Sequence, residues 1–253
     1  MRICDVVLHE LFDDTNLSFV EKAVCLGATA YPADSIASLA ARLRIPKSTA
    51  LYACRNLSKR GWMDLRRTGR KLCPIPLVPR TCQVNLARAL EKDYNMAANK
   101  GEFLMKRHLD LRIHSEEFLD NARPKFLTNP MTDEPLEYDR YYLQGVAFEF
   151  NGLQHSIMTR VHRDENALRE VKTRDLLKRA LSEKAQVNLI TVMAEDLRPG
   201  AFERLLPRNL PQKVIDESGP YYRTLAKICI AYDNKTQQEA ARIAGLAKPA
   251  TQK

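Results

Sequence analysis

The sequence contains no run of about 18 consecutive apolar residues, so none of its segments is a candidate transmembrane helix. It has no CxxC pair and no histidine at zinc-ligand spacing, and its six cysteines are scattered, which argues against a zinc site or a disulfide framework. Internal repeats and low-complexity tracts are also missing. These absences predict a soluble, cytoplasmic protein with reduced thiols and no membrane partner.

What the sequence does have is length and positive charge. Its 253 residues are enough for two domains, and a formal net charge of +9 favours a polyanionic partner. The order of the predicted elements gives an α+β fold class. We divide the chain into a helix-and-hairpin domain at 1–80, a helical connector at 81–114, an α/β core at 115–200 and a helical C-terminal extension at 201–253.

The N-terminal segment alternates short helices and turns. Ser18 and Glu21 have capping-box spacing and open a helix that ends near Gly27. A second helix is predicted over about 35–42, and a third begins at Pro46, which suits a first helical turn, and ends before Gly61. Two strands, 62–67 and 71–76, then flank a Thr-Gly-Arg turn.

This order resembles the winged helix-turn-helix domains of bacterial regulators. Between Arg42 and Lys71 the basic residues outnumber the acidic ones, of which Asp64 is the only example. The resemblance implies that double-stranded DNA is the partner, although winged helices also serve as protein-docking modules. The expected DNA contacts are Lys47, Ser48, Thr49, Tyr52 and Arg55 on the recognition helix, and Arg66, Arg67, Arg70 and Lys71 in the wing.

Residues 81–120 are rich in Leu, Ala, Lys and Glu, and we predict that they are helical. After Leu136 the pattern changes to strand, strand, helix, strand. Asp139 and Glu149 fall on the two strands of a hairpin that turns near Gly145, so their carboxylates can converge on a hard divalent cation such as Mg²⁺. A carboxylate within the apolar run VAFEF requires a partner, because burial of an isolated charge is costly.

The segment FEFNGLQH carries further polar residues directly after this strand. A helix predicted to begin at Arg174-Asp175 places Asp175 and Lys178 on one face, and NLITVM then reads as a strand. The series D…ExNGxQH…RDxxK…LITV resembles the very-short-patch-repair-like branch of the PD-(D/E)xK nucleases over about residues 115–197. That resemblance implies a restriction-endonuclease-like α/β nuclease core.

The resemblance also implies roles for individual residues. Asp139 and Glu149 would bind Mg²⁺ or Mn²⁺, with the Phe150 carbonyl as a third ligand. Asn151 stands where the superfamily has a lysine, and Gln154, His155 or Lys178 could take over that lysine's role. Asp175 belongs to the same helix motif, and Glu116 or Glu117 in HSEEFL matches a helix glutamate that helps to hold metal-bound water.

Each residue also has a simpler interpretation. Asp139 could cap a turn or pair with Arg140, His155 could be an interior histidine, and Asp175 with Lys178 could form an exposed helix pair. The sequence predicts a metal-dependent DNA endonuclease, a homodimer if both strands are cut. The alternative is a transcription or replication regulator whose nuclease-like domain is inactive.

Overall fold

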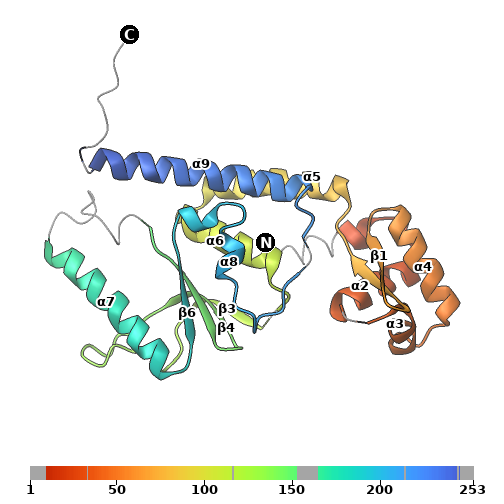
Figure 1. Ribbon diagram of the computed structural model, residues 1–253, viewed down its shortest axis with the longest axis horizontal. Coiled ribbons are helices and arrows are strands. Elements are labelled where there is room, and N and C mark those ends of the chain that lie inside the picture. The colour runs from red at the N-terminus through yellow and green to blue at the C-terminus, as the bar shows by residue number, and fades with distance from the viewer. Residues whose placement is uncertain are drawn as a thin grey trace, which may run out of the picture. The chain divides into compact units, whose positions relative to one another are not determined.

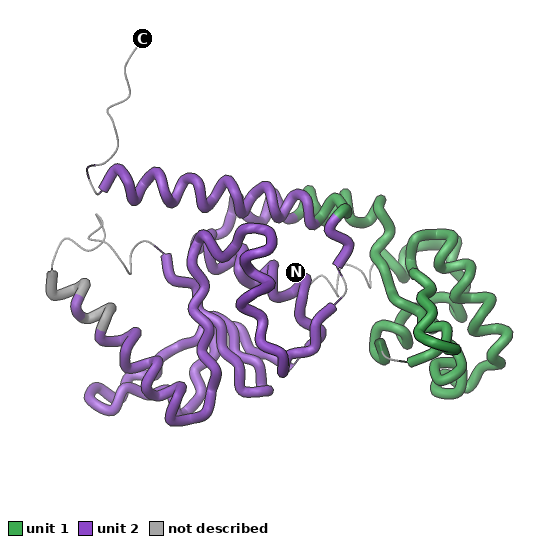
Figure 2. Tube along the Cα trace, in the orientation of Figure 1, with its two compact units in different colours: residues 1–89, 218–221 green, residues 90–217, 222–253 purple. Residues whose placement is uncertain are grey.

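The computed structural model describes residues 10–32, 34–115, 117–152, 165–213, 215–243 and 245. The chain splits into two compact units, Met1–Ala89 with Ser218–Tyr221 and Leu90–Glu217 with Tyr222–Lys253 (Figure 2). Both units contain helices and strands, which confirms a mixed α and β composition.

Residues 19–76 of the first unit form three helices followed by a two-stranded hairpin. These are α2 (Phe19–Ala30), α3 (Ile36–Arg42), α4 (Lys47–Lys59), β1 (Met63–Thr68) and β2 (Lys71–Pro76). The capping box at Ser18 and Glu21 is present, and Gly69 adopts a φ of 60° in the tight turn between the strands. The core is apolar and includes Leu39, Leu57 and Trp62. The predicted helices and hairpin of this segment are therefore confirmed.

The second unit is built around a four-stranded sheet in the order β3-β4-β5-β6. Its first two strand pairs are antiparallel, and β5 and β6 are parallel. A parallel pair needs a crossover connection, which α7 provides. After α5 (Arg80–Met96), the elements are α6 (Lys100–Arg112), β3 (Phe118–Ala122), β4 (Tyr138–Tyr142), β5 (Val146–Phe150), α7 (Glu165–Lys184), β6 (Asn188–Val192), η2 (Glu195–Leu197), α8 (Phe202–Leu205) and α9 (Pro220–Ile243).

Helices pack on this sheet through apolar and charged contacts. α7 runs beside β6 (Figure 1), and its Leu177 and Leu181 pack on a core cluster that includes Ala147. α6 approaches β4 and β5, where Arg140 forms an ion pair with Asp110 at 2.6 Å. Both helices therefore bring side chains to the two central strands.

Two predictions about secondary structure were wrong. Residues 81–120 do not form continuous helix, because α6 ends at Arg112 and β3 follows at Phe118. β3 is a short edge strand with three exposed residues, and its pairing with β4 outweighs a composition poor in β-branched residues. The second error concerns α7, which begins at Glu165 and not at Arg174.

Candidate active site

Asp139 and Glu149 lie in one row across the sheet. The pairs Arg140–Phe148 and Glu149–Thr191 fix the registers of β4, β5 and β6. Continuing the β4–β5 register by one residue places Asp139 opposite Glu149. The two carboxylates therefore occupy neighbouring strands at the same end of the sheet, as the strand pattern of the sequence predicts.

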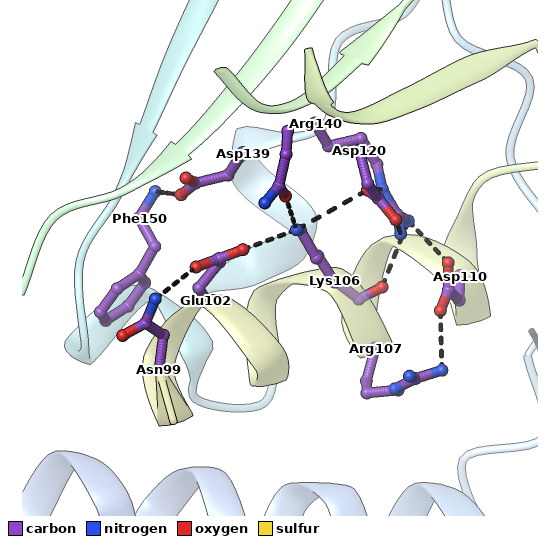
Figure 3. A network of polar contacts seen from close by, with 10 residues as sticks. Asn99, Glu102, Lys106, Arg107, Asp110, Asp120, Asp139, Arg140 and Phe150 are labelled. Atoms are coloured by element: carbon purple, nitrogen blue, oxygen red, sulfur yellow. Dashed lines mark hydrogen bonds and ion pairs between the residues drawn. The ribbon is translucent and has the colours of Figure 1, made fainter. Parts of the chain in front are cut away.

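Asp139 is held at this strand end by a backbone donor. Its Oδ2 accepts a hydrogen bond of 2.7 Å from the N–H of Phe150 (Figure 3), beyond the last paired residues of β4 and β5. The pKa of Asp139 is raised to about 6, mainly by burial; the carboxylates of Glu102 and Glu149 contribute to the rise, and the Phe150 hydrogen bond and the Lys106 ammonium oppose it. This carboxyl group is thus half-buried and lies near two other carboxylates.

Glu149 is buried, and it forms an ion pair with Lys178 of α7. The Lys178 ammonium contacts Oε1 of Glu149, and both side chains are almost completely enclosed, with exposed fractions of 12% and 11%. The burial of a carboxylate within VAFEF is therefore accompanied by a positive partner, as the sequence requires. The alternative in which Lys178 belongs to an exposed helix pair does not describe this contact.

Glu102 of α6 is a site residue that the sequence analysis missed. It lies close enough to Asp139 to raise the pKa of that carboxyl group. Glu102 also accepts hydrogen bonds from Lys106 at 2.6 Å and from Asn99 at 3.1 Å (Figure 3). In the sequence, Glu102 and Lys106 look like an ordinary i, i+4 pair on a helix surface, so no local signal singles them out.

Phe150 occupies a close approach between the sheet and α6. A Cβ atom at Gly101 would lie 2.0 Å from the Phe150 ring, so only glycine leaves room for the ring at this point. Tyr232 of α9 lies near the ring, with centroids 6.1 Å apart. Because the Phe150 N–H binds Asp139, this packing also fixes the position of the Asp139 carboxylate.

The donors at this strand end suit a hard divalent cation. Asp139 and Glu149 carry carboxylate oxygens at this strand end, and Glu102 lies nearby on α6. Repulsion among these carboxylates adds to burial in raising the pKa of Asp139, and a dication would relieve that repulsion. Among the described residues, no three His, Cys, Asp or Glu side chains are already arranged as a complete metal-binding group. This is compatible with Mg²⁺, which commonly takes one or two carboxylates and keeps several waters. In the structure Lys178 and Lys106 engage two of the three carboxylates.

Of the other residues predicted for this site, the structure describes Asn151 and Asp175 but not Gln154, His155 or Glu116. Asn151 is half-buried and extends β5, since its N–H donates to the carbonyl of Val192 at 2.9 Å. Asp175 lies on α7, one helical turn before Lys178. Gln154 and His155 lie outside the described residues, as does Glu116.

Glu117 does not lie on a helix. It is an exposed residue just before β3, and its Oε2 accepts a hydrogen bond of 3.0 Å from Gln144. The match of Glu117 to a helix glutamate is therefore wrong, because α6 ends at Arg112. The helix carboxylate beside Asp139 is Glu102. Asp139 likewise does not pair with Arg140, whose guanidinium binds Asp110 and Asp120.

In the first unit, the predicted DNA contacts are mostly exposed. Thr49 is half-buried, and Arg66 pairs with Asp64 at 2.8 Å in an exposed ion pair. Tyr52 is conspicuous for an aromatic residue, because 68% of its surface is accessible. The exposed members of the set are Lys47, Ser48, Tyr52, Arg55, Arg66, Arg67, Arg70 and Lys71.

No helix in the described part of the chain is long and apolar enough to cross a membrane. No protein-family model matches the sequence. No solved structure matches it either. Uncharacterized protein 033L of Invertebrate iridescent virus 3 is 33% identical over 113 residues, which make up 42% of this chain and 57% of that protein. The match thus spans little more than half the length of the viral relative.

Proposed function

We propose that the protein is a Mg²⁺- or Mn²⁺-dependent DNA endonuclease of the PD-(D/E)xK type, with Asp139 and Glu149 as its metal-binding carboxylates. The observation that carries the proposal is the placement of these two side chains opposite each other at the end of β4 and β5, with Lys178 in contact with Glu149. The order α6-β3-β4-β5-α7-β6 brings the carboxylates and the lysine together from three different elements.

A divalent cation bound here would stabilise charge on the phosphoryl oxygens and lower the pKa of the attacking water. Asp139 and Glu149 would hold the cation, with the Phe150 carbonyl and Glu102 as further oxygen donors. The Phe150 N–H orients the carboxylate of Asp139, and the close packing of Phe150 on Gly101 keeps that donor in place. Positioning of this kind supplies much of the rate enhancement in phosphoryl transfer.

Lys178 is the best candidate for the role of the lysine that Asn151 replaces. Its ammonium already lies at the Glu149 carboxylate, so it could orient the attacking water or stabilise negative charge at phosphorus. Lys178 belongs to α7 and not to β5. The role of the catalytic lysine would thus be kept, although a residue of another element provides it.

The first unit would deliver the nuclease to double-stranded DNA as a winged helix-turn-helix domain. The exposed basic side chains of α4 and of the β1–β2 hairpin support this proposal, since they suit contacts to phosphates. Cleavage of both strands with one site per chain would require a homodimer.

The alternative is a DNA-binding regulator with an inactive nuclease-like unit, and Asn151 in the lysine position favours it. The two proposals differ in their response to Mg²⁺. Supercoiled plasmid incubated with the full-length protein and Mg²⁺ should be nicked or linearised, and EDTA should prevent this. Intact plasmid, together with DNA binding in a gel shift, would support the regulator.

A further inference from the structure

The side chain of Lys106, on α6, lies near the end of the sheet that carries Asp139. Its ammonium donates to Oε1 of Glu102 at 2.6 Å and lies 3.9 Å from Asp120 (Figure 3). It also donates to Oδ1 of Asn121 at 2.7 Å. Only 16% of the Lys106 side chain and 20% of the Glu102 side chain are exposed. The interaction is therefore shielded from water more than an ordinary pair on a helix surface.

The partners of Lys106 surround Asp139. Asp120 pairs with Arg140 and Ala122 with Tyr138, so the β3–β4 register places Asn121 opposite Asp139. Asn121 adopts a φ of 53°, a left-handed conformation that asparagine tolerates better than most residues, and its side chain reaches Lys106. Lys106 thus binds one neighbour of Asp139 on the sheet and another on α6.

The surrounding network holds Lys106 in this place. Arg140 is 2% exposed and binds Asp120 through Nε at 2.7 Å. It also binds Asp110 of α6 at 2.6 Å, so the guanidinium connects β3 and β4 to the helix that carries Lys106. Arg140 therefore restrains the elements on both sides of the ammonium.

We propose that Lys106 is a resident counter-cation that competes with the divalent metal for Glu102, and so sets the affinity of the site for metal. The inference rests on the proposed metal site at Asp139 and Glu149. An ammonium and a dication repel each other, and both are attracted to the same carboxylate. Binding of the metal through Glu102 therefore weakens the contact of Lys106 with that carboxylate. Lys106 is in this sense a positioning residue, because it acts through Glu102.

The test is the affinity for Mg²⁺, measured by calorimetry on the full-length protein without DNA. Lys106→Met should bind Mg²⁺ about tenfold more tightly than the parent, because a neighbouring positive charge is removed from an enclosed site. Lys106→Arg keeps the charge and should bind as the parent does. Unchanged or weaker binding by a folded Lys106→Met protein would overturn the inference.

A matched control is available on the same helix. The Lys100 ammonium donates to the carbonyls of Tyr94 and Asn95 and lies over the Tyr94 ring. Lys100→Met should therefore leave Mg²⁺ affinity at the parent value. A gain equal to that of Lys106→Met would show that any lost charge on α6 has this effect, and would contradict a specific role for Lys106.

The pathway through Glu102 is tested by a double-variant cycle. Lys106→Gln also removes the positive charge and should by itself increase the affinity for Mg²⁺. In a Glu102→Gln background the same change should increase that affinity much less, because the shared carboxylate is gone. An equal increase in Mg²⁺ affinity in both backgrounds would overturn the proposed competition for Glu102. Because it uses Lys106→Gln, this cycle still decides the question if Lys106→Met does not fold.

The cycle also separates this inference from the proposed function. If the parent binds Mg²⁺ and Glu149→Gln does not, but Lys106 variants are unchanged, the inference alone fails. If the parent does not bind Mg²⁺, the proposed site and the inference fail together.

Discussion

Lys178 of α7 and Glu149 of β5 form an enclosed ion pair across 29 residues of sequence. Leu177 and Leu181, on either side of Lys178 in the sequence, pack on the core of the second unit, and this anchors the helix turn that carries the lysine. The ammonium is thus placed by helix packing and not by a neighbouring strand residue. On the proposed nuclease function, Lys178 would take the role of the lysine that Asn151 replaces.

We predict that Lys178→Met abolishes plasmid cleavage and binds Mg²⁺ at least as tightly as the parent. On the proposed function Lys178 acts on the reacting groups, and its ammonium competes with the cation for the Glu149 carboxylate. In the metal-free protein the change leaves Glu149 buried without this partner, at a cost of about 3 kcal/mol in the free energy of unfolding. Cleavage assays and calorimetry measure the two effects. Lys184 is exposed on the same helix, and Lys184→Met is the control, which should cleave as the parent does. Cleavage by Lys178→Met at the parent rate would disprove the role assigned to Lys178.

A second prediction concerns the approach of Phe150 to α6. Gly101→Ala would bring a Cβ atom to 2.0 Å from the Phe150 ring, so the ring or the helix must move. We expect a loss of about 1–3 kcal/mol in the free energy of unfolding and weaker Mg²⁺ binding, because Phe150 also orients Asp139. Thermal unfolding with and without Mg²⁺ measures both.

The control for this change is Gly152→Ala, whose added Cβ would meet the same ring at an ordinary contact distance of 3.7 Å. It should leave the melting temperature close to that of the parent. Equal stability of the Gly101→Ala and Gly152→Ala proteins would show that the close approach at Gly101 does not restrain the site.

The third prediction concerns the hairpin of the first unit. Replacing Arg66, Arg67 and Arg70 with alanine should weaken duplex binding by the full-length protein. It should also lower the magnitude of the slope of log affinity against log salt by about 3, because about one counterion fewer is released on binding for each phosphate contact that is lost. Gel-shift titrations at several salt concentrations give both values. Removing the exposed charges of Arg223, Lys227 and Lys235 on α9 is a control of equal charge. An equal effect of the two triple changes would argue against a DNA-binding hairpin.

The fourth prediction is a pH dependence of stability that arises from His108. The pKa of His108 is lowered to about 3, mainly by burial and in part by the nearby charge of Arg112. Below about pH 6.5 the unfolded chain gains a proton that the folded protein does not, so stability falls by up to about 1.4 kcal/mol per pH unit as the pH decreases toward 3. His108→Phe should flatten this dependence between pH 7 and pH 5, as urea unfolding measures. An identical slope in the variant would contradict the buried neutral histidine.

Much of the scaffold could be predicted because it is encoded locally. Ser18 and Glu21 predict the start of a helix, and Gly69 predicts a tight turn. The alternating pattern around Asp139 and Glu149 predicts a pair of strands. These signals depend on backbone and side-chain preferences within a few residues. The structure has each of these elements where the sequence places it.

The missed features depend on contacts that are distant in the sequence. β3 is a strand because it pairs with β4, and Glu102 belongs to the site because α6 packs over the end of β5. Neither relationship leaves a spacing rule in the sequence. The partner of Lys178 could not be predicted for the same reason, since the lysine and Glu149 lie on separate elements.

The most direct test of the account is plasmid cleavage by Glu149→Gln beside the parent protein, with Mg²⁺ and with a mock purification to exclude contaminating nuclease. The substitution keeps the side-chain volume but removes a charge that the cation requires, so cleavage should fall by about 100-fold or more while DNA binding through the first unit is unchanged. Cleavage by Glu149→Gln at the parent rate would contradict the proposal that Asp139 and Glu149 form the active site.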